Sequence, residues 1–175
     1  MNTQWHGIMK IFDIKHLDVD GTVLWSDHNI YNLLHSEGEL FILKATFWGG
    51  KSSSVIPDFY YMGLDDRMTV AVGDTLASLA GEPSSNGYVR QGISSNGAMN
   101  FNIVGLHWLA SSPIVAFRST TGPWGPVQNV FLTDTADNSG SLIATAVLSS
   151  PVTVTTGQSV TLRIGIMLQD CTPTT

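Results

Sequence analysis

The chain has 175 residues, which is enough to bury the core of one domain, with or without an appendage. Charged residues make up only 13 % of the chain, and its net charge is −6. Lys and Arg are scattered singly, so no basic stripe is present to neutralise phosphates. We therefore predict no direct nucleic-acid binding. No segment approaches the roughly 20 consecutive apolar residues of a membrane span, and we predict no membrane partner.

The N-terminal segment has the pattern of a hairpin. Ile8–Leu17 is mostly apolar and predicts a strand, and Thr22–Trp25 predicts the strand that returns. The Asp-Gly pair between them is a strong hairpin signal because both residue types tolerate positive φ. Ser26 or Asp27 is suited to cap a helix that follows.

The segment from Asn29 to Phe47 is ambiguous. Its apolar residues fall near one helical stripe, but Gly38 costs about 1 kcal/mol against Ala inside a helix. Leu40–Phe47 has enough β-branched and aromatic residues to form a strand instead. We expect a helix before Gly38 and a strand after it. We assign residues 1–55 to an N-terminal αβ appendage, a docking arm made of a hairpin plus a helix.

Beyond residue 55 the composition shifts to Gly, Ser, Thr and β-branched residues, and strand patterns recur about every ten residues. One short helix is expected at Thr75–Leu79, where Asp74 can cap it. Short strands at this spacing are typical of a β-sandwich or jelly roll. We therefore predict a mainly β fold, with a β-sandwich domain over 56–170 and a polar tail over 171–175. The predicted strands are Phe59–Leu64, Tyr88–Ile93, Met99–Val104, Ile114–Arg118, Val127–Leu132, Leu142–Leu148, Val152–Thr155 and Val160–Leu168.

No residue pattern predicts catalysis or metal binding. The His residues lack the His-x-x-x-His spacing that presents two ligands from one element, and a Gly-x-Ser-x-Gly elbow is absent. Asp65-Asp66-Arg67 indicates a turn with a local ion pair, because adjacent strand residues point to opposite faces. The single cysteine, Cys171, excludes an intrachain disulfide and fits assembly in a reducing cytosol. We predict a protein that is not an enzyme and that needs no cofactor and no metal.

The most distinctive stretch of the chain is a stiff turn that ends in strand-forming residues. Pro83 stiffens the entry to the turn, and Gly87, after an Asn, supplies positive φ. Tyr88 and Arg90 alternate to one side of the strand, with Gln91 on the other. The Tyr88 ring can be buried while its hydroxyl stays hydrogen-bonded, and Arg90 can lie along that ring or clamp a neighbouring backbone.

A second stiff turn carries Trp124 between two Gly-Pro corners, the second of which begins at Gly125. Trp124 is placed to close the end of the sandwich or to offer a flat anchor to a neighbouring subunit. Trp108 and Trp5 lie in other elements and share no spacing with it, so we predict that they anchor the core or an interface. The alternative is that these rings stack on sugars, as in a carbohydrate-binding module.

These turns and the strands around them follow one another in a set order: a Gly-Tyr-x-Arg-Gln element, a Thr-Gly-Pro-Trp-Gly-Pro-Val element and a final hairpin. The residues in question are Gly87, Tyr88, Arg90, Gln91, Phe117, Gly122, Trp124, Gly125, Val127, Gly140, Leu142, Ile143, Ala146, Leu148, Thr153, Val154, Gly157 and Ser159–Leu162. From Tyr60 to Asp170 this order resembles a family of small structural proteins of tailed bacteriophages. The first fifty residues lie outside the resemblance.

The resemblance implies a virion structural protein, made in the host cytoplasm and located in the virion. It points to a capsid cement or decoration protein that stabilises the shell by bridging capsomers, with the major capsid protein or other virion proteins as partners. A neck, tail or fibre accessory protein is the nearest alternative. A glycan-binding host-attachment module is the alternative from another class. We expect a homo-oligomer and take a trimer at a lattice three-fold as its form.

Overall fold

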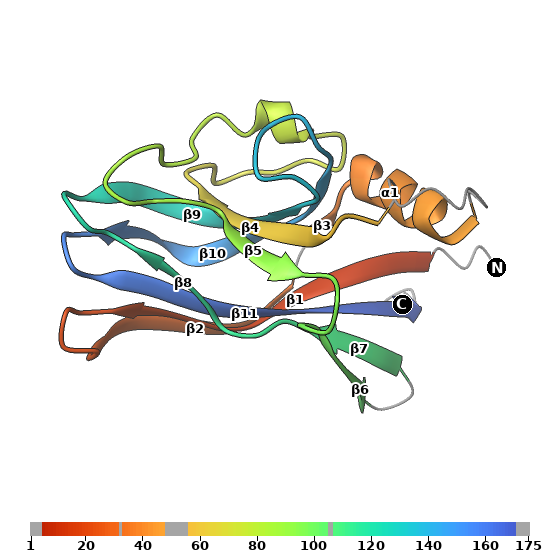
Figure 1. Ribbon diagram of the computed structural model, residues 1–175, viewed down its shortest axis with the longest axis horizontal. Coiled ribbons are helices and arrows are strands. Elements are labelled where there is room, and N and C mark those ends of the chain that lie inside the picture. Colours follow the sequence, from red (N-terminus) through yellow and green to blue (C-terminus); the bar gives the residue numbers. More distant parts are fainter. Residues whose placement is uncertain (1–4, 32, 48–55, 105–106, 171–175) are drawn as a thin grey trace, which may run out of the picture.

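The computed structural model describes residues 5–31, 33–47, 56–104 and 107–170, which form two antiparallel sheets packed face to face (Figure 1). Sheet A has the strand order β2 (Val23–Tyr31), β1 (Trp5–Leu17), β11 (Ser159–Asp170), β7 (His107–Ser111) and β6 (Asn100–Val104), and β8 (Val115–Arg118) also pairs with β11. Sheet B has the order β3 (Leu33–Leu34), β10 (Leu142–Val154), β9 (Trp124–Thr133), β4 (Phe59–Asp65) and β5 (Gln91–Ser94). The helical elements are α1 (Ser36–Phe47) and the 3-10 turn η1 (Leu76–Ser78). The predicted mainly β sandwich is confirmed, and the jelly-roll connectivity stays a prediction.

The core lies between the two sheets. Because successive strand residues point to opposite faces, each long strand gives every second side chain to it. On β11 these are Val160, Leu162 and Ile164, all essentially without exposed area. A smaller cluster is made by Leu76, Leu79, Phe131 and Leu142. It packs against the other face of sheet B, since Phe131 lies between two residues that face the main core.

The predicted N-terminal appendage is not seen, because β1 is an inner strand of sheet A. It lies between β2 and β11 and pairs with β11 along its whole length. The Ile11 and Ile14 side chains of β1 are fully buried in the core. Residues 5–17 are therefore part of the sandwich and not a docking arm outside it. The predicted boundary at residue 55 and the predicted polar tail over 171–175 lie outside the described residues.

The prediction for the helix needs two corrections. Ser26 and Asp27 cap no helix and lie in β2, whereas α1 runs without a break through Gly38 to Phe47, so the expected change from helix to strand is wrong. The reason is a close approach, since a Cβ on Gly38 would lie 2.2 Å from the carbonyl oxygen of Ile143 on β10. Glycine lets the first turn of α1 rest directly on sheet B, and this packing outweighs its low helix propensity.

Buried polar contacts fix the start of α1 to sheet B and to the loop that carries η1. The Glu37 carboxylate accepts hydrogen bonds from the N–H of Leu142 at 2.7 Å and of Leu76 at 3.3 Å. Just before the helix, His35 is fully buried, and its Nε2 lies 2.9 Å from Thr145 Oγ1. Burial lowers the pKa of the His35 imidazole, so the neutral ring is favoured.

Most of the remaining predicted elements are confirmed with shifted bounds. The Asp-Gly turn joins β1 to β2, with Gly21 at a φ of +87°. The strands predicted at Leu142–Leu148 and Val152–Thr155 are one strand, β10, whose pairing with β9 shifts register between them. β5 begins three residues later than predicted. The prediction misses β7, which pairs with both β6 and β11.

Candidate interaction surface

The residues singled out in the sequence are divided between two parts of the sandwich. Around the loops that precede β5 and β9 the structure gathers Pro83, Gly87, Tyr88, Arg90, Trp124 and Gly125. The loop before β9 lies at the end of the sandwich opposite α1 and the β6–β7 hairpin (Figure 1). Trp108 is on β7 and so belongs to that other end, while Gln91 begins β5. Trp5 begins β1, and its side chain is outside the described ones.

The turn before Tyr88 is held by the loop that joins β8 to β9. Asn86 and Gly87 both have positive φ, 58° and 87°, as the Asn-Gly pair predicts. A Cβ on Gly87 would lie 2.2 Å from Thr120 Oγ1, so this position needs glycine. The Thr120 N–H donates to the Asn86 carbonyl at 2.8 Å, and the Asn86 side-chain amide donates to the Pro123 carbonyl at 2.6 Å. These hydrogen bonds hold the loop before β5 and the loop before β9 together as one corner of the sandwich.

Tyr88 is buried at the centre of this corner. Its ring stacks on Phe117 at a centroid distance of 5.7 Å and meets Trp124 edge to face at 5.6 Å. Its hydroxyl accepts the Leu64 N–H at 2.7 Å and donates to Glu82 Oε1 at 3.0 Å. Burial, with the Glu82 charge beside it, raises the pKa of Tyr88 well above its ordinary value, so the hydroxyl stays neutral. Ring and hydroxyl are both satisfied within the chain.

Arg90 is tied to the same glutamate. Its Nη2 lies 2.6 Å from Glu82 Oε2 and its Nε 2.9 Å from Oε1, and the two side chains are only 6 % and 17 % exposed. The guanidinium carbon lies 5.0 Å from the Phe131 ring centre, and Nη1 donates to the Thr135 carbonyl at 3.3 Å. Arg90 thus clamps a neighbouring backbone, which is one of its two predicted uses. Its charge and its donors are used inside the chain.

Trp124 closes this end of the core, as predicted. Only 4 % of it is exposed, which leaves no flat face for a neighbouring subunit. Gly125, the next residue, has a φ of +103°, and a Cβ there would lie 2.7 Å from the Val152 carbonyl oxygen. We call the group formed by Glu82, Tyr88, Arg90, Phe117 and Trp124 the Tyr88 cluster. Its members are partners of one another and have little surface left for other molecules.

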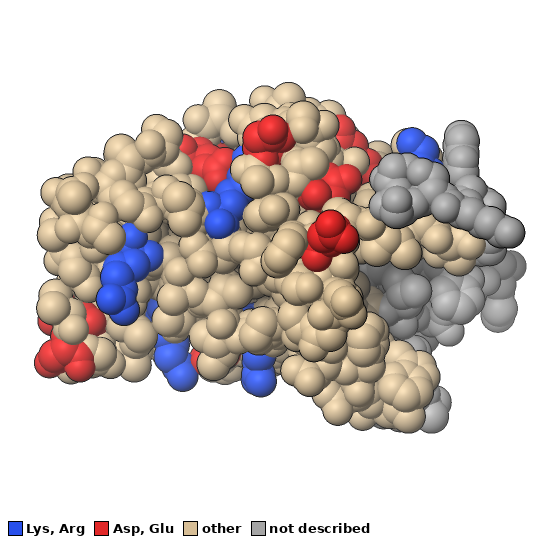
Figure 2. Space-filling view, viewed as in Figure 1, with Lys and Arg blue, Asp and Glu red and all other residues tan. Residues whose placement is uncertain are grey.

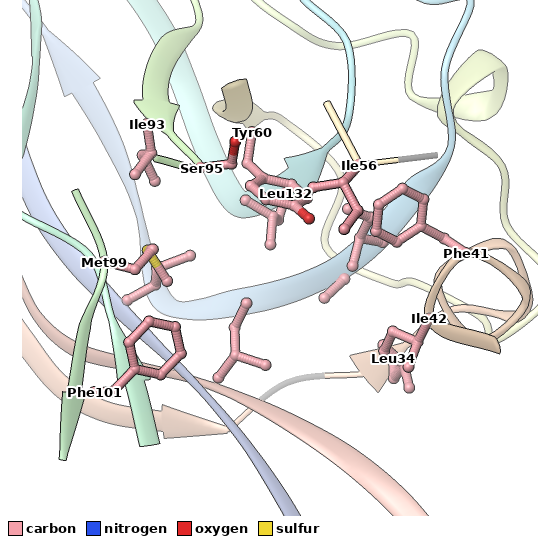
Figure 3. Close-up of a pocket in the computed structure, with 14 residues that line it drawn as sticks. Leu34, Phe41, Ile42, Ile56, Tyr60, Ile93, Ser95, Met99, Phe101 and Leu132 are labelled. Carbon is pink, nitrogen blue, oxygen red and sulfur yellow. The ribbon is translucent and has the colours of Figure 1, made fainter. Parts of the chain in front are cut away.

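The opposite end of the sandwich holds a cavity of about 270 Å³ between the sheets (Figure 3). Phe41 of α1 and Tyr60 of β4 line one side, where their rings meet edge to face at 6.0 Å. Met99 and Phe101, at the start of the β6–β7 hairpin, line the other side. All lining residues apart from Tyr60 and Ser95 are aliphatic, Met or Phe. Such a lining suits an apolar group and gives no support to a charged one.

The β6–β7 hairpin carries exposed apolar side chains beside this cavity. Phe101, Ile103, Val104 and Trp108 are 68 %, 63 %, 52 % and 64 % exposed. The chain has no Asp, Glu, Lys or Arg from residue 91 to residue 117, and the hairpin shows no charged atoms in Figure 2. Contiguous exposed apolar surface of this kind marks an interaction site, since soluble monomers rarely keep it.

The outer face of α1 also carries exposed apolar side chains. Leu40 and Leu43 are half exposed and lie three residues apart, on one side of the helix. We call β6, β7, the cavity and this face of α1 the hairpin end. Sequence reasoning missed it, because β7 was not predicted and Trp108 was weighed as a single aromatic residue. The long uncharged run around β6 was the signal that could have found it.

Buried charge elsewhere serves the fold. The fully buried Asp65 carboxylate accepts the N–H of Arg67 and of Gly81, both at 3.0 Å, and lies 3.7 Å from Arg67 Nε, which confirms the predicted turn with a local ion pair. Within the described residues, no group of three or more His, Cys, Asp or Glu could hold a metal ion. In the same part of the chain, no helix is long and apolar enough to cross a membrane.

No protein-family model, no curated protein and no solved structure matches the chain. The resemblance to phage structural proteins therefore stays a prediction from the order of turns and strands. What the chain does has to be argued from the chemistry of its two ends. The Tyr88 cluster is occupied by its own contacts, and the hairpin end is not.

Proposed function

We propose that this protein is a non-enzymatic structural protein of a bacteriophage virion, a capsid cement or decoration protein that bridges capsomers. Its partners are the major capsid protein or other virion proteins, and its place is the assembled particle. The contact surface in this proposal is the hairpin end. The virion setting comes from the sequence resemblance, and the choice of surface comes from the geometry.

The observation that carries the proposal is the exposed, uncharged, apolar hairpin. Phe101 and Trp108 are the aromatic residues of this surface, and no Asp, Glu, Lys or Arg lies on β6 or β7. Interface cores are depleted in charge and enriched in aromatic residues, so this composition suits a protein partner. A catalytic pocket needs converging polar groups, and the lining of the cavity provides only Tyr60 and Ser95.

The mechanism is mass action on an assembled lattice. A ligand that binds the assembled shell and not its free subunits stabilises the shell by the free energy of binding. Many weak contacts then add up, because a copy held at one site reaches a second one at high effective concentration. Three copies around a lattice three-fold, as proposed from the sequence, would present three hairpin ends to the surrounding capsomers.

The test is occupancy on purified shells that lack the protein. A double variant, Phe101→Glu with Trp108→Glu, is expected to lower occupancy at least tenfold, because two charges would be buried in an apolar contact. Val89→Glu is the matched control, since Val89 is 63 % exposed but lies beside the Tyr88 cluster. Full occupancy by the double variant, with its melting temperature unchanged, would exclude the hairpin end as the contact surface.

The number of copies per particle separates the two virion placements. Cement at every lattice position requires hundreds of copies, whereas a neck, tail or fibre accessory is present in a dozen or fewer. Densitometry of a stained gel of purified virions, scaled to the major capsid protein, measures this ratio. A low ratio would replace the cement proposal by the accessory one and leave the contact surface unchanged.

One observation favours glycan binding as a second candidate. Of the tryptophans whose side chains are described, Trp108 is mostly exposed, Trp25 is partly buried and Trp124 is buried. A flat exposed ring can stack on a sugar face. Binding to a glycan array that is lost in Trp108→Ala and kept in Trp124→Phe would establish this function in place of cement.

A further inference from the structure

β6 is an edge strand without the usual protection against pairing. It is the last strand of sheet A on its side and pairs only with β7 within the described residues. Native edges are blunted by charges, prolines, bulges or covering segments. Residues 100–104 contain no charge and no proline, their register with β7 is continuous, and all five are exposed. The outer backbone groups of β6 are therefore available to another strand.

The strand at the other edge of sheet A, β2, is protected against pairing with a further strand. β2 carries Asp27, whose Oδ2 accepts the Ser149 N–H of sheet B at 3.1 Å. Asn29 on the same strand has a φ of +56°, which breaks its regular extended form. A charged side chain and a local distortion of the backbone thus hinder the pairing of β2 with another strand, and β6 has neither feature. The difference marks β6 as the unprotected edge of sheet A.

The sequence of β6 is complementary to itself in the antiparallel direction. With Asn102 opposite Asn102 of a second copy, Phe101 lies opposite Ile103 and Asn100 opposite Val104. Side chains directly opposite in antiparallel strands lie on the same face of a sheet. Phe101 and Ile103 would then form aromatic and β-branched pairs on one face, and the two Asn102 amides would meet on the other. A shift of one residue would lose these matches.

The distribution of charge along the chain favours a second copy of the same chain as the partner of β6. Each chain carries a net charge of −6, so most surfaces of two copies repel each other. The segment from residue 91 to residue 117 contains no Asp, Glu, Lys or Arg, and β6 lies at its centre. Two copies that meet along β6 bring no formal charges into the contact. A basic or acidic partner would find no opposite charge on this edge.

We propose that β6 pairs with β6 of a second copy across a two-fold axis at Asn102, which joins the two A sheets into one continuous sheet. A two-fold contact between identical edges is closed, so it makes a dimer and no fibre. It is distinct from the three-fold arrangement proposed above, and it forms in solution without any shell. It shares β6 and Phe101 with the proposed shell contact, but it is tested by dimerisation in solution, so its failure can be told apart from failure of the virion role.

The first experiment places like charges on the axis. Asn102→Lys puts two ammonium groups opposite each other, which destabilises a directly opposed pair. Sedimentation velocity over a concentration series is expected to show a dimer for the wild-type chain. For Asn102→Lys the dimer dissociation constant should be about tenfold higher or more. Asn96→Lys is the matched control, because Asn96 is also an exposed Asn but lies in the turn after β5, and it should dimerise like the wild type.

Mixing two variants makes the experiment independent of any loss of folding. Asn102→Asp alone should be monomeric for the same reason as Asn102→Lys. An equimolar mixture of the two should recover the dimer, because opposite charges then face each other. A monomeric wild-type chain at every concentration, or a mixture that stays monomeric, would overturn the proposal. So would an Asn102→Lys variant that dimerises as strongly as the wild type.

A cross-link tests the register itself. In a Cys171→Ser background, Asn102→Cys places two thiols opposite each other, at a spacing that a disulfide can bridge. Mild oxidation is expected to give a covalent dimer with Asn102→Cys and none with Asn100→Cys, whose two thiols lie far apart in this register. Equal cross-linking of the two variants, or cross-linking of Asn100→Cys alone, would contradict the two-fold at Asn102.

Discussion

At one end of the sandwich Trp124 is buried against Tyr88, while at the other Trp108 projects from a two-stranded hairpin into solvent. Both residues are tryptophans on strands of a charge-poor chain, and sequence spacing alone gave them the same two possible roles. The Tyr88 cluster brings its own hydrogen-bond partners and its own charge pair, so its aromatic rings are used for stability. The hairpin end brings neither and keeps its aromatic rings on the surface. In this molecule burial against neighbouring side chains, and not the ring itself, separates a structural site from a candidate contact site.

The largest effect is expected from removing residues 1–18, which would break both ends together. β1 runs along the whole of β11 and places Ile11 and Ile14 in the core. Without it sheet A is split, so we expect a chain with no cooperative melting transition by circular dichroism. Val23→Ser, a change at a half-exposed position on the neighbouring strand, should melt like the wild type. A truncated protein that still folds would show that the sandwich does not need β1 and that β1 is an appendage.

The comparison of the two tryptophans predicts unequal costs for the same substitution. Trp124→Ala opens a cavity beside Tyr88 and is expected to lower the free energy of unfolding by about 3–5 kcal/mol. Trp108→Ala removes a mostly exposed ring and should change it by about 0.5 kcal/mol or less. Urea unfolding of both variants measures the difference. Similar losses at the two positions would show that the hairpin end also depends on its aromatic residue for stability.

A smaller loss is expected from breaking the ion pair of the Tyr88 cluster. Arg90→Met leaves the Glu82 carboxylate with less compensation in a poorly exposed site, which we expect to cost about 3 kcal/mol. Lys15→Met removes a pair with Asp13 in which both side chains are about 40 % exposed, and about 0.5 kcal/mol is expected there. A double variant, Arg90→Met with Glu82→Gln, should recover part of the first loss. Additive losses would mean that the two side chains act independently.

The smallest effect concerns the start of α1, beside the hairpin end, and depends on pH. Burial lowers the pKa of His35 in the folded state below the value of about 6.5 that it has in the unfolded chain. The unfolded chain then binds the proton more readily, so this contribution to stability is present above about pH 6.5 and is lost as the pH falls through the lowered pKa. His35→Gln should flatten the pH dependence of the unfolding free energy between pH 7 and 5, measured by urea unfolding at each pH. An unchanged slope in His35→Gln would contradict the assignment.

The sequence predicts the local parts of this structure well and the long-range parts poorly. The turn at Asn86 and Gly87 follows from residue types that tolerate positive φ, and the structure confirms it. That Arg90 lies over Phe131 could not be predicted, because the two are joined only by the folding of separate loops. Gly38 was expected to interrupt a helix, and the residue that reverses this expectation, Ile143, lies about a hundred residues further along the chain on β10.

The same limit explains the errors at the two ends of the chain. The pairing of β1 with β11 joins segments that are more than 140 residues apart, so no local pattern could show it. β7 was missed because His107–Ser111 has no clear alternation of apolar and polar residues, and its identity as a strand comes from its pairing with β6 and β11. The hairpin end could be inferred from the sequence only as a long uncharged segment.

The contact between the first strand and the last has a consequence for synthesis. During translation β1 is made more than 140 residues before β11, the strand that fills its other side. Sheet A therefore cannot close until β11 has been made, and pairing at this sequence distance is slow. Until then a nascent chain would hold Ile11 and Ile14 uncovered, and chains with such exposed apolar surface aggregate. Production of the protein at a high level would then depend on chaperones that shield the unfinished sheet.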